Sequence, residues 1–210
     1  MTQGADGRTG GRAARTALLG VVLLSACPVV RLSAQDSLPI GFGTLKRDDI
    51  VVRFDTPELD IQFLPLEESV TRLLAPDTYR SLRDLLHSKR GEIDDLARRA
   101  GVLRPVLAMV SFFGLVPQAR FVPEDVNITS RGRLFRPVGI VPLSPKWASY
   151  QLDAREQAVA IYLFEEGISF RETLAVSYQG LTNDSWSRSI LTLERERARV
   201  MARAQGRPNP

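Results

Sequence analysis

Two short runs of apolar residues constrain the fold of this chain most. Residues 106–113 and 158–164 are almost wholly apolar, so a strand formed by either run would carry apolar side chains on both faces. Such strands belong in the middle of a sheet that is covered on both sides. We therefore expect both runs to be core strands, with Val159, Ile161 and Leu163 buried together with Val106 and Val110.

Other segments predict shorter or half-buried strands around these two. Residues 60–63 and 173–179 alternate polar and apolar side chains, which is typical of a strand with one buried face. Residues 121–129 and 134–141 flank a turn that contains Gly132, a residue that tolerates hairpin geometry. A further strand is expected at residues 50–54, and Pro57 and Pro65 predict strand ends or edge positions.

Between residues 66 and 101, the spacing of apolar residues changes from the period of a strand to the period of a helix. Tyr79, Leu82, Leu85 and Leu86 share one helical face, and Gly101 follows a second amphipathic stretch. We interpret this helical segment as a lid on the core of the sheet, with a partner-binding hairpin as the alternative. A last helix is expected near the C-terminus, with Ile190, Leu193, Val200 and Met201 on its apolar face.

The N-terminal segment has the three parts of an export signal. Arg8, Arg12 and Arg15 precede an uncharged apolar run at residues 16–26, which is too short to span a bilayer comfortably. Two cleavage sites are possible. Cleavage after residue 34 would release the chain, whereas cleavage after residue 26 would leave Cys27 as a lipidation site and an anchor.

Charge and cysteine content exclude several classes of protein. Residues 1–34 hold four of the arginines and one aspartate, so the rest of the chain is close to neutral, although the chain as a whole carries +4. Near-neutral charge provides no field that would attract nucleic acid. Cys27 is the only cysteine, which excludes an intramolecular disulfide and the usual Cys/His zinc sites.

These boundaries predict one domain with short extensions. We expect a signal peptide at residues 1–34, or 1–26 in a lipoprotein, then a tether at residues 35–45. A single β-sandwich domain would follow at residues 46–205, with the helical insert at 66–101. Residues 206–210 would form a disordered tail.

One hairpin carries a resemblance to a known group of domains. Phe121, Pro123 and Asp125 lead into a strand, and after Gly132 the return strand holds Phe135-Arg136-Pro137. This arrangement resembles a hairpin in immunoglobulin-like β-sandwich domains of uncharacterised exported bacterial proteins, over about residues 104–179. The resemblance implies a mainly β fold with helices (α+β), an antiparallel immunoglobulin-like sandwich, to which the helical insert and the C-terminal helix are additions. It implies no catalytic residues.

Residues that carry chemistry are few. His87 is the only histidine, and the chain has neither a nucleophile elbow nor a glycine-rich phosphate loop. Glu165 and Glu172 are the carboxylates that an acid/base hydrolase would use. Trp147 and Tyr150, in a loop between strands, are candidates for contact with a partner or a glycan, or else a plug for the end of the sandwich.

The sequence therefore favours an exported, non-catalytic envelope domain, periplasmic or envelope-associated, whose partner is another envelope protein. We expect no catalytic residue, cofactor, metal or nucleic acid, and membrane attachment only through Cys27. Two alternatives stay open. One is a hydrolase of envelope material that uses Glu165 and Glu172, and the other is a carrier that holds an apolar ligand between the helical insert and the sheet.

Overall fold

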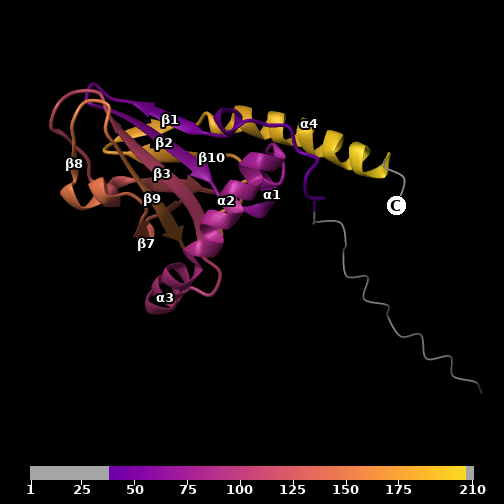
Figure 1. Ribbon diagram of the computed structural model, residues 1–210, viewed down its shortest axis with the longest axis horizontal. Coiled ribbons are helices and arrows are strands. Elements are labelled where there is room, and N and C mark those ends of the chain that lie inside the picture. The colour runs from indigo at the N-terminus through magenta and orange to yellow at the C-terminus, as the bar shows by residue number, and fades with distance from the viewer. Residues whose placement is uncertain (1–37, 207–210) are drawn as a thin grey trace, which may run out of the picture. The chain divides into compact units, whose positions relative to one another are not determined.

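The computed structural model describes residues 38–206 (Figure 1). The predicted signal peptide, Cys27 and residues 207–210 lie outside the described residues. The described chain is a mixed α+β structure with antiparallel sheets and a C-terminal helix, as predicted.

The larger sheet has five antiparallel strands in the order β1-β2-β3-β9-β7. Their bounds are Val52–Asp55 for β1, Leu59–Pro65 for β2, Val106–Gly114 for β3, Gln157–Phe164 for β9 and Pro137–Pro142 for β7. The two apolar runs thus form β3 and β9, which are neighbours in the interior of the sheet. This confirms that they are core strands.

The two faces of this sheet bury different residues. Val110 pairs with Ala160, and Met109 pairs with Ile161, so Val110 and Ile161 project from opposite faces. Both side chains are fully buried. The expectation that they pack together was wrong, because directly opposed residues share a face and Val110 is offset by one residue from Met109, the partner of Ile161.

The smaller sheet has four antiparallel strands in the order β11-β10-β5-β6. Their bounds are Leu181–Asn183 for β11, Leu174–Tyr178 for β10, Asn127–Ser130 for β5 and Arg133–Phe135 for β6. It shares one apolar core with the larger sheet, since the rings of Phe112 on β3 and Tyr178 on β10 lie 5.7 Å apart. The hairpin between β5 and β6 is present, with Arg131 and Gly132 at positive φ in its turn.

The segment expected to be one strand at residues 134–141 is divided between the two sheets. β6 ends at Phe135 in the smaller sheet, and β7 begins at Pro137 on the edge of the larger one. Proline cannot donate a backbone hydrogen bond, and it is accommodated at a strand start on a sheet edge. Pro123–Asp125 likewise forms a short 3-10 helix (η2) where a continuous strand was expected.

One two-stranded ladder and two further 3-10 helices complete the described fold. β4 (Ala119–Arg120) pairs with β8 (Gln151–Leu152), next to the 3-10 helix η3 (Pro145–Ser149). A further 3-10 helix, η1 (Arg47–Asp49), precedes β1.

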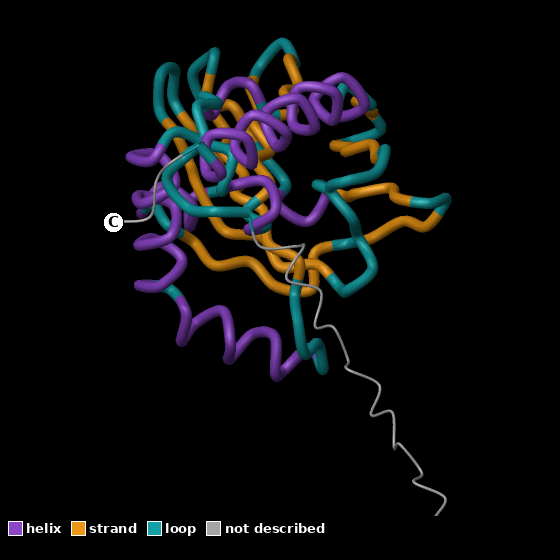
Figure 2. Tube along the Cα trace, turned by 90° about the vertical axis from the view of Figure 1, so that its right-hand side faces the viewer, coloured by secondary structure: helices purple, strands orange, loops and turns teal. Residues whose placement is uncertain are grey.

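The helical insert contains α1 (Glu68–Thr71), α2 (Pro76–Ser88) and α3 (Arg90–Ala100), and α4 (Trp186–Gln205) ends the described chain. Figure 2 shows α4 at the top and α3 at the bottom, with the strands between them. Leu82 and Ile93 are buried in the shared core, and Leu96 of α3 lies directly over Gly139 of β7. The insert therefore packs as a lid on the outer face of the larger sheet.

Residues 38–45 do not form the expected tether. Leu38 and Leu45 are buried, and Leu45 exchanges backbone hydrogen bonds with the segment after α1, donating to Leu73 and accepting from Ala75 at 3.1 and 2.9 Å. Gly43 lies so close to Leu73 that a β-carbon would stand 2.3 Å from its carbonyl carbon. A polar and glycine-rich composition suggested a linker, but the glycine serves close backbone packing.

Candidate functional site

Trp147 is buried, so it is a plug for the end of the sandwich and not a contact residue for a partner or a glycan. It is 5% exposed, and its ring lies 5.4 Å from the ring of Phe121, 5.8 Å from that of Phe112 and 6.0 Å from that of Tyr162. The indole thus closes one end of the core. A tryptophan packed in this way has no free face for a partner or a glycan.

Tyr150, three residues later, is exposed. Its side chain is 50% accessible, and its backbone is left-handed with φ of 51°. The ring lies edge-on to Phe121 at 6.0 Å, and the Tyr150 carbonyl accepts a hydrogen bond from the Phe121 N–H at 3.1 Å. The position of this exposed ring is therefore defined by the buried aromatic cluster beneath it.

Three more exposed apolar side chains lie at the same end of the larger sheet. Leu115 and Val116 follow β3, and Val122 follows β4, with exposures of 46%, 37% and 39%. Backbone hydrogen bonds from Gly114 to Glu156 and from Arg155 to Gly114 join the end of β3, just before Leu115, to the connection between β8 and β9. These connections lie at the end of the sheet away from α3 (Figure 1). We call Leu115, Val116, Val122 and Tyr150 the loop-end residues.

Glu165 and Glu172 are held in separate surface ion pairs. Glu172 pairs with Arg131, and Glu165 pairs with Arg133, so two arginines of the β5–β6 hairpin each hold one carboxylate. The hydrogen bond and charge of Arg131 lower the pKa of Glu172. A general acid needs the opposite shift, toward neutral pH. This arrangement does not favour the carboxylate hydrolase.

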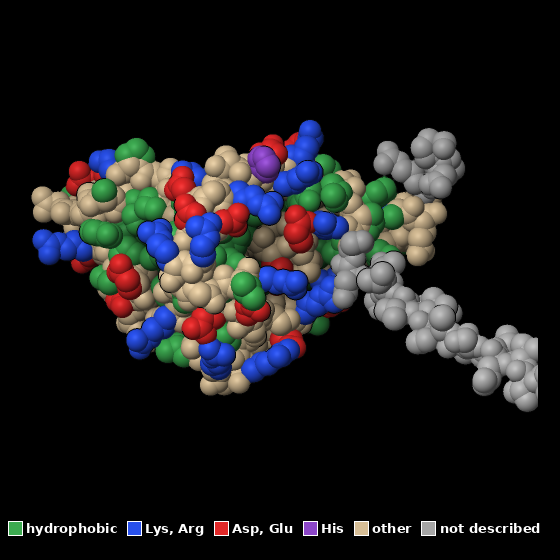
Figure 3. All heavy atoms as spheres, turned by 90° about the horizontal axis from the view of Figure 1, so that it is seen from below, with side chains coloured by type: hydrophobic (Ala, Val, Ile, Leu, Met, Phe, Trp, Pro, Cys, Tyr) green, Lys and Arg blue, Asp and Glu red, His purple; other side chains and the backbone are tan. Residues whose placement is uncertain are grey.

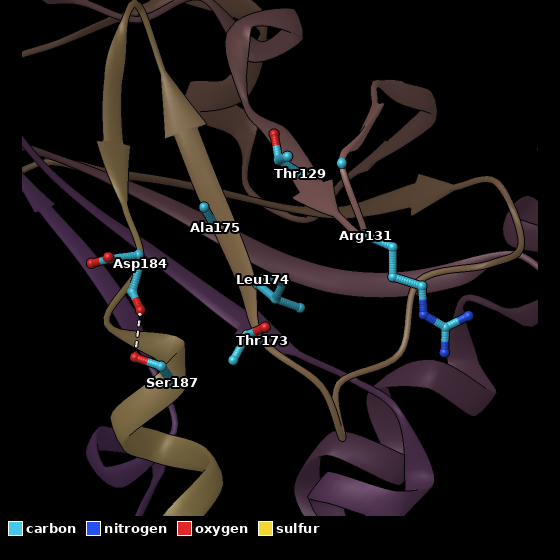
Figure 4. A pocket seen from close by; sticks show the side chains of 8 residues that line it. Thr129, Arg131, Thr173, Leu174, Ala175, Asp184 and Ser187 are labelled. Atoms are coloured by element: carbon cyan, nitrogen blue, oxygen red, sulfur yellow. Dashed lines mark hydrogen bonds between the residues drawn. The ribbon is translucent and has the colours of Figure 1, made fainter.

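A shallow polar hollow lies on the smaller sheet, next to the start of α4 (Figure 4). Its volume is about 430 Å³, and hydroxyl groups reach it from Thr129 on β5, Thr173 before β10 and Ser187 on α4. Ser187 donates its hydroxyl to the Asp184 carbonyl at 3.0 Å, and Arg131 is occupied by Glu172. No aromatic residue lines the hollow, so it lacks the ring that stacks on a sugar.

His87 is exposed on α2, and Figure 3 shows the histidine at the surface with basic side chains beside it. Among residues 38–206, no three His, Cys, Asp or Glu side chains gather where they could hold a metal ion. Within the same residues, no helix has both the length and the apolar character needed to cross a membrane.

Comparisons with known proteins found no matching family model, curated protein or solved structure.

Glu196 is a buried acid that sequence reasoning missed. It is 1% exposed on α4, and its carboxylate accepts hydrogen bonds from Thr44 and from Arg203. The helical spacing of Glu196 could have predicted its burial, because it lies three residues after Leu193 and four before Val200, on the buried face. Met201, expected on that face, is 40% exposed.

Proposed function

We propose that this chain is an exported, non-catalytic envelope domain that binds another envelope protein through its loop-end residues. The proposal rests most on one observation, the exposure of Tyr150 above a buried aromatic cluster. Tyrosine is enriched at the centres of protein interfaces, because its large ring gains contact area with little loss of conformational freedom. The ion-paired Glu165 and Glu172 support a non-catalytic role.

The finer fold assignment is part of the same proposal. An immunoglobulin-like sandwich is supported by two antiparallel sheets that share one core and by a chain that passes from one sheet to the other at Pro137. In that architecture, loops gathered at one end of the sheets commonly carry recognition. The loop-end residues occupy such connections.

The position of the N-terminal segment fits this function. Residues 38–45 pack beside α1 and α4, whereas the loop-end residues follow the opposite end of β3. β3 has nine residues, so the strand alone extends about 30 Å. An anchor upstream of residue 38 would leave the loop end free to meet a partner.

Photo-crosslinking in the native envelope tests the docking surface. With benzoylphenylalanine at Val122, we expect one discrete adduct, and Tyr150→Ala in the same chain should remove it. The matched control places the same probe at Leu191 of α4, which is 61% exposed and far along the chain from the loop end. Equal adducts from both positions, or an adduct that persists in Tyr150→Ala, would contradict the proposal.

Export is tested by the N-terminus of the mature protein. If cleavage follows residue 26, the chain begins at a lipid-modified Cys27, and Cys27→Ser abolishes its partition into membranes. If cleavage follows residue 34, the parent and the Cys27→Ser variant are both soluble and begin at Gln35. A chain that retains Met1 and stays in the cytoplasm would refute export.

A further inference from the structure

A second concave surface lies between the helical insert and the larger sheet. The cleft is formed by α2, α3 and the start of β3, and its volume is about 420 Å³. Leu86, Ile93, Pro105 and Leu107 supply its apolar lining. Ile93 is buried in the core, and Leu86 and Leu107 are partly buried against it, so this lining is a continuation of the packed interior. The volume falls within the roughly 300–1,000 Å³ of small-molecule sites.

The rim of the cleft is basic. Arg83, His87 and Arg90 line it together with one acid, Asp94. Arg90 is paired with Asp94 at 3.6 Å, whereas Arg83 has no ion pair with any residue in the described part of the chain. Arg83 and His87 are one helical turn apart on α2 and therefore lie on the same side of it. The unpaired guanidinium is available to an anion.

We propose that this cleft binds a single-chain amphipathic acid, with its alkyl chain on the apolar lining and its carboxylate or phosphate at Arg83. Burial of the chain removes apolar surface from water, and the guanidinium forms charge-assisted hydrogen bonds with the head group. Neither the apolar lining nor Arg83 would select this ligand on its own. An uncharged alkane leaves Arg83 unused, and a small inorganic anion leaves the lining exposed. This site is separate from the loop-end residues and does not depend on their proposed role.

Binding of soluble probes to the mature protein tests the site. Dodecanoate, dodecyl phosphate and dodecanol are titrated below their micellar concentrations by isothermal calorimetry. We expect saturable binding of both acids, and weaker binding of the alcohol. Arg83→Gln should weaken the binding of the acids about tenfold, which is the loss of one charge-assisted contact, while leaving dodecanol unchanged.

Two further variants distinguish binding in the cleft from nonspecific attraction to surface charge. Arg98→Gln removes an exposed arginine that pairs with Asp95 on α3, outside the cleft lining, and should leave all affinities unchanged. Leu86→Gln should weaken the acids and the alcohol alike, because it removes apolar lining that they share. The fold of each variant is checked by circular dichroism, and Arg83 is exposed, so its replacement is compatible with folding.

Three outcomes would overturn the proposal. The first is the absence of saturable binding of both acids to the parent protein. The second is equal loss of affinity in Arg83→Gln and Arg98→Gln. The third is sedimentation with phosphatidylglycerol vesicles through Arg83 without binding of the free acids, which would identify the face as a membrane contact instead of a ligand site.

Discussion

The carboxylate of Glu196 accepts hydrogen bonds from both the backbone N–H and the hydroxyl of Thr44, at 2.9 and 2.8 Å, across 152 residues of sequence. Arg203 also donates to this carboxylate at 2.9 Å and to the carbonyl of Phe42 at 2.6 Å. One buried acid thus joins the N-terminal segment to the last helix. The contact explains why residues 38–45 are packed and do not form a tether.

Replacement of Glu196 should destabilise the domain. Glu196→Ala removes the charged acceptor of the part-buried hydrogen bonds from Thr44, and a hydrogen bond to a charged group contributes about 1.5–3 kcal/mol. Chemical denaturation measures the change. Glu194→Ala is the matched control, because Glu194 is 53% exposed in an ion pair with Arg197. A surface pair of this kind contributes at most about 1 kcal/mol, so a control effect equal to that of Glu196→Ala would contradict the role assigned to Glu196.

Stability should also depend on the ionisation of Glu196. Burial by itself raises the pKa of this carboxyl, but the hydrogen bonds from Arg203 and Thr44 outweigh burial, and the pKa is lowered overall. The resulting stabilisation is therefore complete above the unfolded pKa of about 4.3 and is lost as the pH falls through the lower folded value. We expect the difference in unfolding free energy between the parent and Glu196→Gln to shrink as the pH falls from about 6 to about 3. A constant difference over that range would show that the charge of Glu196 is not involved.

The helical insert should unfold together with the sheets. Leu82 is 7% exposed and belongs to the shared core, so Leu82→Asp would bury an unpaired charge. We expect loss of the cooperative thermal transition of the whole domain. Ser81→Asp, on the exposed side of the same helix, should melt close to the parent. A Leu82→Asp protein with unaltered melting would mean that the insert is an independent surface.

The interior of the larger sheet should be sensitive to truncation. Ile161 is fully buried on β9, and Ile161→Ala should cost about 2–5 kcal/mol through lost packing and a cavity. Val159 on the same face is only partly buried, so Val159→Ala should cost clearly less. Urea unfolding with an unchanged m-value measures both losses. An Ile161→Ala loss below about 1 kcal/mol would be inconsistent with the packing described for β9.

Two glycines should respond to alanine in opposite directions. At Gly43, a β-carbon would meet the backbone of Leu73 and Leu74 at 2.3–2.4 Å, and backbone atoms cannot move aside cheaply. Gly43→Ala should therefore destabilise the domain by more than about 1 kcal/mol, as overpacking does. At Gly91, in α3, a β-carbon meets nothing within 4 Å, and alanine should stabilise the domain by about 0.4–1 kcal/mol. Thermal melting of the two variants gives the comparison, and a stabilising Gly43→Ala would contradict the close approach.

The sequence by itself determined the core strands, the helical insert and the C-terminal helix. Apolar runs such as residues 106–113 and 158–164 favour central strands covered on both faces, and an apolar face at helical spacing must pack on something. These inferences depend on local periodicity, which can be obtained from the sequence without knowledge of the tertiary structure. Periodicity also identified Leu82 as a core residue.

The tertiary structure decided which surfaces meet. Trp147 and Tyr150 share one loop, yet only the packing of Phe112, Phe121 and Tyr162 shows that the first is buried and the second exposed. Glu196 resembled a solvated acid among arginines until Thr44 came to lie against it. The type of a side chain indicates how strongly it avoids water. It does not indicate which distant segment will cover that side chain, because such coverage depends on contacts between residues far apart in the sequence.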